Sequence, residues 1–597
     1  MTITRLFDLL AEKNAEKPEV PFLSYKVHGQ WKTFNFKETQ EQANRVSQLL
    51  LNLGLKRDDK IAIIANNRPE WNFVDLGALQ LGVVDVPMYP TISEKDYEFI
   101  FNDAGVQYAF VGDATIYQKV RPLMGRVPTL KGIFTFDEIT GANSFWKALP
   151  AAPDTEAIKR AEAEVSENDL ATIIYTSGTT GNPKGVMLTH KNIVSNVRSV
   201  KEVTPFTEGE CALSFLPLCH SFERMVFYSY LSKGIHIYYA ESIETIGDNL
   251  KDVKPYCFTT VPRLLEKVYE KIMEKGNALE GFKRKLFFWS IDLGLKYELG
   301  KDQGFFYNTQ LAIARKLVFS KWQEALGGRV KFIVTGAAPM QPRLIKLFTA
   351  AGIVVIEGYG LTETSPVLSA NRIEETGRVI GTVGIPIPGV EVSLAEDGEI
   401  IARGPNIMKG YYNRPDLTDE VIDTEGWFHT GDIGQWVDMH GQRFLKITDR
   451  KKELFKTSGG KYVAPQVIEN KMKESPYIEQ IMVVGDARKF VAALIVPSYL
   501  NLFDWCKHHA PEVSTNAHIV DNEKIKQLIN AEIERLNKDF GKWEQIKKFV
   551  LLENEWTVEG GELTPTMKVK RKIIYDRYRT LVEDMYENEE SFAAGMP

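Results

Sequence analysis

The sequence has few cysteines and no long apolar run, and each lack excludes a class of protein. Its 597 residues include four cysteines, none in a Cys-x-x-Cys pair, so neither a disulfide framework nor a zinc ribbon is indicated. The amino terminus has no apolar segment of the secretory kind, and the longest apolar run, Phe490 to Pro497, is too short to span a bilayer. We expect a cytoplasmic protein, and any membrane contact to be peripheral, on the inner face of the membrane.

Excess positive charge is also lacking. The net charge is −6, which argues against a general nucleic-acid binder. Hydrophobic residues make up 44% of the chain and charged residues 25%, as in globular proteins. A chain of this length exceeds one hydrophobic core, so we expect at least two domains.

The pattern of the chain changes near residue 380. From about residue 60 to 360, short β-rich runs alternate with amphipathic helices, which indicates an α/β domain with largely parallel sheets. Later segments are shorter, and residues 435–447 predict a hairpin that turns at His440 and Gly441. A charged helical stretch is expected from Glu523 to Lys548. A boundary near Lys451 divides the chain into domains 1–450 and 451–597.

One loop is rich in hydroxyls and glycine. The string YTSGTTGNPKG, residues 175–185, follows a β-like run at 170–174. Glycines let backbone N–H groups face a ligand, and hydroxyls and Lys184 add donors and positive charge, which suits a polyphosphate. The string does not match the Walker A pattern. Taken alone, such a loop is more often an ordinary surface turn.

Four further motifs follow in order: GYGLTE at 358–363, TGD at 430–432, DRKKE at 449–453 and LTPTMK at 563–568. Together with the loop, they resemble the adenylate-forming superfamily of acyl-CoA synthetases, peptide-synthetase adenylation domains and luciferases. The resemblance covers nearly the whole chain. It implies a large N-terminal α/β domain with two parallel-rich sheets flanked by helices plus a β-barrel-like subdomain, and a small mobile α+β domain at the C-terminus.

The resemblance also implies the reaction. A carboxylate attacks the α-phosphate of ATP to give acyl-AMP and pyrophosphate, and a thiol then displaces AMP. Glu363 would bind Mg²⁺, and Thr362 would bind the α-phosphate. The residues implied for ATP binding are Thr176, Ser177, Gly178, Thr179, Thr180, Gly181 and Lys184 for the phosphates; Tyr359 and Gly360, facing Gly336, Ala337 and Ala338, for adenine; and Asp432 and Arg450 for ribose.

Three more residues take roles from the resemblance. Lys568 would bridge the carboxylate and the α-phosphate during adenylation, with Lys570 as the alternative lysine in the same basic run. Lys452 falls at the hinge of the mobile domain. His220 would line the site at the acyl carboxylate as an orienting group, whereas a lone histidine is more often a core or surface residue.

The stretch from residue 281 to 322 is similar to the longer-chain fatty acyl-CoA synthetases. We therefore expect a long-chain fatty acid:CoA ligase with Mg²⁺, ATP and coenzyme A as ligands. An aryl or shorter-chain acid, and transfer of the acyl group to a carrier protein, stay as alternatives. A non-enzymatic module would have lost Lys568, Glu363 or the phosphate loop. Chain-length preference and oligomeric state are left open.

A basic run beside aromatic residues has two interpretations. Lys283 to Lys285 precede the apolar run Leu286 to Trp289, and basic and aromatic side chains cooperate at anionic bilayers. Such a stretch is more often a helix packed against its own domain.

Overall fold

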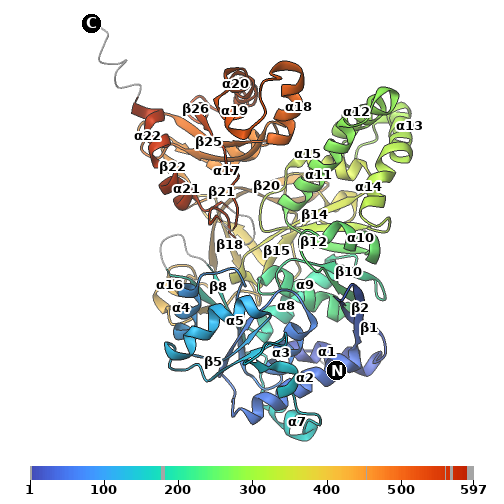
Figure 1. The fold of residues 1–597 in the computed structure, drawn as a ribbon, viewed down its shortest axis with the longest axis vertical. Helices are drawn as coiled ribbons and strands as arrows, with labels where there is room; N and C mark the ends of the chain where they lie inside the picture. Colours follow the sequence, from blue (N-terminus) through green and yellow to red (C-terminus); the bar gives the residue numbers. More distant parts are fainter. Residues whose placement is uncertain (1–2, 177–181, 452, 559, 565–568, 588–597) are drawn as a thin grey trace.

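The computed structural model describes residues 3–176, 182–451, 453–558, 560–564 and 569–587. A large part, blue to yellow in Figure 1, carries a smaller C-terminal part in orange and red at one end. Within the described ranges, no helix combines the length and the apolar character that crossing a bilayer requires. The expected architecture of a large α/β part and a small α+β part is confirmed.

The first large sheet has eight strands in the order β19, β9, β8, β4, β3, β5, β6, β7. The strands from β8 to β7 run parallel, whereas β9 and β19 are antiparallel to their neighbours. In that order their bounds are Gly410–Tyr411, Lys184–Thr189, Leu170–Thr176, Val84–Pro87, Lys60–Ile64, Val106–Val111, Gly132–Thr135 and Asn143–Ser144.

The second large sheet has nine strands in the order β16, β15, β14, β13, β12, β10, β11, β1, β2. The strands from β14 to β1 run parallel, and antiparallel strands flank them on both sides. In that order their bounds are Ile385–Pro386, Val367–Ala370, Val354–Gly360, Phe332–Thr335, Cys257–Thr260, Cys211–Ser214, His236–Tyr239, Pro21–Val27 and Gln30–Asn35.

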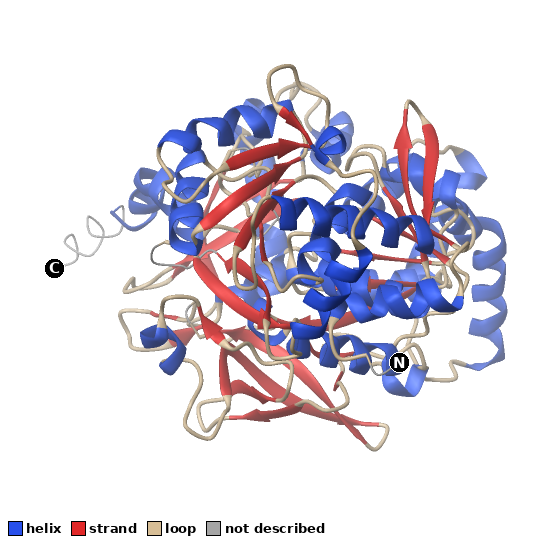
Figure 2. Ribbon diagram, turned by 90° about the horizontal axis from the view of Figure 1, so that it is seen from below, coloured by secondary structure: helices blue, strands red, loops and turns tan. Residues whose placement is uncertain are grey.

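Helices cover the two sheets (Figure 2). One apolar core joins strands of both sheets to the helices α2, α3, α8 and α9. The main helices of this part are α1 Leu6–Glu16, α2 Phe36–Asn52, α3 Pro69–Leu79, α4 Glu94–Ala104, α5 Ala114–Val120, α8 His190–Val203, α9 Ser221–Lys233, α10 Ile246–Val253, α11 Pro262–Asn277, α12 Gly281–Leu295, α13 Gly304–Ala314, α14 Ser320–Ala325 and α15 Pro342–Ala350.

Helix α9 is buried along almost its whole length, although it carries charged residues. Arg224 on α9 contacts Asp75 of α3 at 2.5 Å and Asp85 of β4 at 2.6 Å. A buried charge is tolerated when it is paired and hydrogen-bonded. This pairing fixes α9 between the sheets and therefore fixes the start of the helix, where His220 lies.

A third sheet follows in the region where shorter β segments were expected. Its antiparallel strands are β17 Glu391–Leu394, β18 Glu399–Arg403, β20 Phe428–Met439 and β21 Gln442–Arg450. The predicted hairpin is confirmed: β20 and β21 turn at His440 and Gly441, with φ of 54° and 72°. Both values lie in the left-handed region that two-residue hairpin turns require.

The C-terminal part contains a three-stranded sheet of β24 Ile478–Val484, β25 Val491–Pro497 and β26 Ile546–Leu551. Its main helices are α17 Pro465–Met472, α18 Tyr499–His509, α20 Glu523–Asn537, α21 Arg571–Arg577 and α22 Arg579–Glu587. The helix expected to reach Lys548 ends at Asn537. The Asn537 amide bonds the backbone N–H and C=O of Ile546 at 3.1 and 2.9 Å, which turns the chain into β26.

Candidate active site

One cavity of about 1910 Å³ lies between the large part and the C-terminal part. Its lining includes every predicted site residue that the structure describes: Thr176, Lys184, His220, Gly336, Ala337, Ala338, Tyr359, Gly360, Thr362, Glu363, Asp432 and Arg450. The predicted residues Ser177, Gly178, Thr179, Thr180, Gly181, Lys452 and Lys568 lie outside the described residues. Segments separated by hundreds of positions therefore meet around one space.

The predicted phosphate loop connects β8 to β9, and Thr176 pairs with Lys184 across this antiparallel ladder. Gly185 has no room for a side chain, because an added Cβ would lie 2.8 Å from Ile173 and 3.0 Å from the Tyr175 ring. The Lys184 ammonium lies 4.9 Å from the centre of the Tyr411 ring. The ladder thus holds a cation beside the cavity.

Glu363 lies on a short 3₁₀ turn, Thr362–Thr364. The Tyr411 hydroxyl donates to Glu363 Oε1 at 2.9 Å, and burial together with this carboxylate holds the pKa of Tyr411 well above its usual range. The Ser221 and Thr362 hydroxyls bond at 3.1 Å, which links the turn to the start of α9. A carboxylate oriented in this way still has lone pairs for a cation.

Tyr359 is the residue of β14 that was expected to stack on adenine. Its hydroxyl donates to Asp432 at 2.7 Å, a contact that the motifs alone did not predict. Arg450 Nε lies 3.4 Å from the other Asp432 oxygen, because the two residues are cross-strand partners in β20 and β21. At Gly360, an added Cβ would lie 1.7 Å from the Pro366 carbonyl oxygen, so the chain requires glycine there.

His220 is the N-cap of α9. Its Nδ1 accepts a hydrogen bond from the Phe222 backbone N–H at 3.1 Å. With Nδ1 acting as the acceptor, a neutral imidazole carries its proton on Nε2. The start of α9 thus sets the orientation of the ring, and the role expected of His220 at the acyl carboxylate stays a prediction.

A basic segment of the C-terminal part also lines the cavity at residues 569–573. Arg571 contacts Glu453 at 2.9 Å and Glu469 at 2.6 Å. Glu453 lies 3.5 Å from Arg450, so it connects the strand expected to bind ribose to the segment next to Lys568. Sequence reasoning did not assign Glu453 a role, although it directly follows Lys452.

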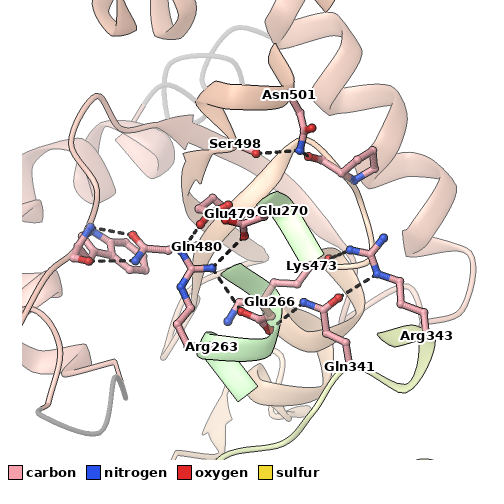
Figure 3. A network of polar contacts seen from close by, with 12 residues as sticks. Arg263, Glu266, Glu270, Gln341, Arg343, Lys473, Glu479, Gln480, Ser498 and Asn501 are labelled. Carbon is pink, nitrogen blue, oxygen red and sulfur yellow. Dashed lines mark hydrogen bonds and ion pairs between the residues drawn. The ribbon is translucent and has the colours of Figure 1, made fainter. Parts of the chain in front are cut away.

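A second polar network joins α11 to the C-terminal part (Figure 3). Arg263 of α11 contacts Glu479 of β24 and lies 3.3 and 3.4 Å from Glu266 and Glu270. Burial, with the Glu479 carboxylate next in effect, raises the pKa of Glu270 to about 7. Close by, the Arg343 guanidinium donates to the Lys473 carbonyl at 3.2 Å. These contacts hold the two parts in the arrangement observed.

Comparisons with known proteins identify the family of this chain. Residues 10–412 match the AMP-binding enzyme family, and residues 453–590 match the AMP-binding enzyme C-terminal domain. A long-chain-fatty-acid–CoA ligase of Mycobacterium bovis is 32% identical over 589 residues, 97% of both chains. Long-chain-fatty-acid–CoA ligase 1 of Homo sapiens is 33% identical over 610 residues, 96% of this chain and 84% of the relative.

Solved structures share the fold. A fatty acyl CoA synthetase of Mycobacterium tuberculosis aligns with a TM-score of 0.64 and 21% identity, covering 97% of this chain and 99% of that one. The A-PCP didomain of a carboxylic acid reductase from Segniliparus rugosus, in complex with AMP, aligns with a TM-score of 0.76 and 20% identity, covering 100% of this chain and 84% of that one. The chain is thus a member of the AMP-binding enzyme family, with relatives that are named long-chain-fatty-acid–CoA ligases.

Proposed function

We propose that this protein is an ATP-dependent long-chain fatty acid:CoA ligase that releases AMP and pyrophosphate. The observation that carries the proposal is the single cavity lined by residues of all the described motif segments. The names of the curated relatives support the acid and the acceptor. Because these relatives are named for long-chain fatty acids, they do not favour an aryl acid as the substrate.

The first half-reaction brings one anion to another, so it needs fixed positive charge and hydrogen-bond donors. In our proposal, Lys184 and the loop at 176–181 hold the β- and γ-phosphates while Thr362 binds the α-phosphate. The fatty acid carboxylate attacks the α-phosphorus, a new C–O–P linkage forms, and the bond to pyrophosphate breaks. Lys568 would stabilise the negative charge that develops on the carboxylate oxygen and on the α-phosphate oxygen.

Adenosine would lie against β14 and β20. Tyr359 would face the adenine ring, and Asp432 with Arg450 would bind the ribose hydroxyls. The observed bonds of the Asp432 carboxylate to the Tyr359 hydroxyl and Arg450 support this assignment, because they hold the carboxylate in a defined position.

The oxygen donor that Glu363 offers to the cavity is of the kind that Mg²⁺ binds. Mg²⁺ prefers oxygen ligands and commonly takes one or two protein carboxylates plus substrate phosphates. Glu363 supplies an oriented carboxylate oxygen next to Tyr411. When bound there, the ion would neutralise negative charge on the phosphate oxygens.

The second half-reaction uses the same site after the C-terminal domain moves. We place the domain boundary after residue 450, with the hinge at Lys452. The coenzyme A thiolate then attacks the acyl carbon of acyl-AMP, the thioester bond forms, and AMP leaves. The loop at 456–461, which contains two glycines, would border the path of the pantetheine arm.

The acyl chain would lie against apolar residues of the cavity lining. These include Val200, Val203, Phe206, Met225 and Val226, from the end of α8, the segment after it and α9. These side chains match a hydrocarbon chain in chemistry. His220 would orient the carboxylate at the start of this region.

The proposal places the protein in the cytoplasm, with free coenzyme A as acceptor and peripheral contact with the inner face of the membrane. The contact suggested at residues 283–289 needs revision, because Phe287 is 6% exposed and packs in the core while Leu286, Phe288 and Trp289 are only partly exposed. The run forms the start of a packed helix.

The test is pyrophosphate release from Mg·ATP across short, medium, long and aromatic acids, with and without coenzyme A, and with products identified by mass spectrometry. Long-chain acyl-CoA is the expected product. Acyl-AMP that accumulates even when coenzyme A is present would instead assign the protein to the ligases that pass the acyl group to a carrier protein.

A further inference from the structure

Helix α13 has an apolar side that faces solvent. Its sequence, GFFYNTQLAIA, contains no charged residue, and a five-residue π turn, Arg315–Phe319, continues it. Phe305 is 87% exposed and Phe306 is 78% exposed, while Ile313 and Leu317 are 45% and 51% exposed. We call these four residues the α13 face. Their spacing places them on one side of the continuous helix.

The opposite side of the same helix is already packed. Leu311, Ala314 and Val318 are buried in the core beside α12 and α15, and the Tyr307 hydroxyl donates to the Leu293 carbonyl at 2.9 Å. The helix therefore does not need its outer residues for folding. Two nearly fully exposed phenylalanines side by side mark an interaction surface rather than scattered apolar exposure.

The surrounding charge selects the kind of surface that would cover this face. Residues 280–324 contain eight basic and five acidic residues, a net charge of +3 in a chain of net charge −6. Lys316 is exposed and lies between Ile313 and Leu317 on the outer side of the helix. Figure 1 places α12 and α13 at the outer edge of the large part. A partner must therefore accept aromatic side chains and carry negative charge.

We propose that the α13 face docks on the surface of an anionic lipid bilayer. Exposed phenylalanines enter the boundary between headgroups and acyl chains, and the basic side chains around them contact lipid phosphates. The proposal gains a purpose from the proposed function, because a long-chain fatty acid partitions into bilayers. The exposure of the α13 face and the positive charge of its surroundings are observed independently of the proposed function.

The test is flotation of the full chain with vesicles of phosphatidylcholine alone or mixed with phosphatidylglycerol, in the absence of ATP, fatty acid and coenzyme A. The variant is Phe305→Ser with Phe306→Ser. Ile243→Ser is the matched control, because Ile243 is 70% exposed and lies between β11 and α10. Lys316→Glu tests the charge of the face.

We expect binding to anionic vesicles that the double variant weakens by about tenfold or more, since a buried phenylalanine contributes a few kcal/mol. Lys316→Glu should weaken it severalfold, and Ile243→Ser should bind like the unchanged chain. Turnover of a long-chain fatty acid dispersed without vesicles should be the same in all four proteins. If such turnover were absent but vesicle binding behaved as expected, the proposed function would fail and the docking surface would stand.

Two results would overturn the proposal. One is equal flotation of the double variant and the unchanged chain. The other is a solution mass of two copies that falls to one copy in the double variant without lipid, which would assign the α13 face to self-association.

Discussion

The Tyr359 hydroxyl donates a 2.7 Å hydrogen bond to the Asp432 carboxylate, so the strand expected to face adenine is tied to the strand expected to bind ribose. Tyr359→Phe keeps the ring and removes this bond. We expect the KM for ATP to rise about 10- to 150-fold with little change in kcat, because a hydrogen bond to a charged group contributes about 1.5–3 kcal/mol. Steady-state kinetics in ATP measure this, and an unchanged KM would contradict the positioning role.

Glu363 should set the metal requirement. Glu363→Gln keeps the shape but removes the charge that attracts Mg²⁺, so the Mg²⁺ concentration for half-maximal adenylation should rise about tenfold or more. Tyr411→Phe removes only the 2.9 Å bond to Glu363 and should shift that concentration less. Equal Mg²⁺ titrations for Glu363→Gln and the unchanged enzyme would reject the assignment.

Variants of Lys568 and Lys570 in the C-terminal basic run test which lysine serves adenylation. Lys568→Ala should abolish acyl-AMP formation and leave thioester formation from supplied acyl-AMP largely intact, because its charge is needed only when the carboxylate meets the α-phosphate. Lys570→Ala is the matched variant and should retain adenylation. The opposite pattern would transfer the role to Lys570, and loss of both half-reactions in Lys568→Ala would show that their roles are not separate.

Arg263 should favour adenylation over thioester formation. It contacts Glu479 across the two parts, in the arrangement in which residues 569–573 line the cavity. Arg263→Ala leaves three carboxylates without their shared cation, so the adenylation rate should fall about 5- to 30-fold relative to thioester formation from supplied acyl-AMP.

Two variants control this prediction. Arg284→Ala removes an exposed arginine of α12 and should change neither rate. The exchanged pair Arg263→Glu with Glu479→Arg should recover part of the adenylation rate. An equal loss of both half-reactions in Arg263→Ala would mean that the contact only stabilises the fold.

The pKa of Glu270, raised to about 7, predicts a pH-dependent stability. Between its usual value near 4.5 and about 7, the folded protein keeps a proton that the unfolded chain has lost. The contribution of Glu270 to the free energy of unfolding therefore falls as the pH rises through this window and is level above it. Glu270→Gln has no carboxyl group that titrates, so its free energy of unfolding should not show this fall.

Urea unfolding at a series of pH values measures the effect. The free energy of unfolding of Glu270→Gln minus that of the unchanged chain should grow from about pH 5 to about pH 7. Glu274→Gln, on the exposed side of the same helix, is the control and should give a flat difference. A flat difference for Glu270→Gln as well would remove the predicted titration.

Local patterns predicted the elements well where a single residue type sets the geometry. The turn at His440 and Gly441 needs positive φ at two positions, so the hairpin could be predicted from the glycine between two β-rich runs. The end of α20 could not be predicted from the sequence, because it depends on hydrogen bonds between the Asn537 amide and the backbone of Ile546. A capping bond of this kind has no periodic signature.

The candidate site was predictable only in part, for a related reason. Motif residues could be assigned roles because their strings resemble those of the adenylate-forming superfamily, and the described ones line one cavity. Arg263 and Glu479 lie 216 positions apart, and no spacing rule connects them before the chain folds. The exposed side of α13 was missed in the same way, because an apolar helix without charges resembles a buried one until its packing is seen.

The most direct test of the central claim is to follow the carboxylate oxygen. Long-chain fatty acid labelled with heavy oxygen at both carboxylate positions is turned over with ATP, Mg²⁺ and coenzyme A, and the products are weighed by mass spectrometry. If the carboxylate attacks the α-phosphorus, AMP carries one labelled oxygen, the thioester keeps the other, and pyrophosphate carries none. Label in pyrophosphate or orthophosphate, or unlabelled AMP beside acyl-CoA, would contradict an acyl-AMP intermediate.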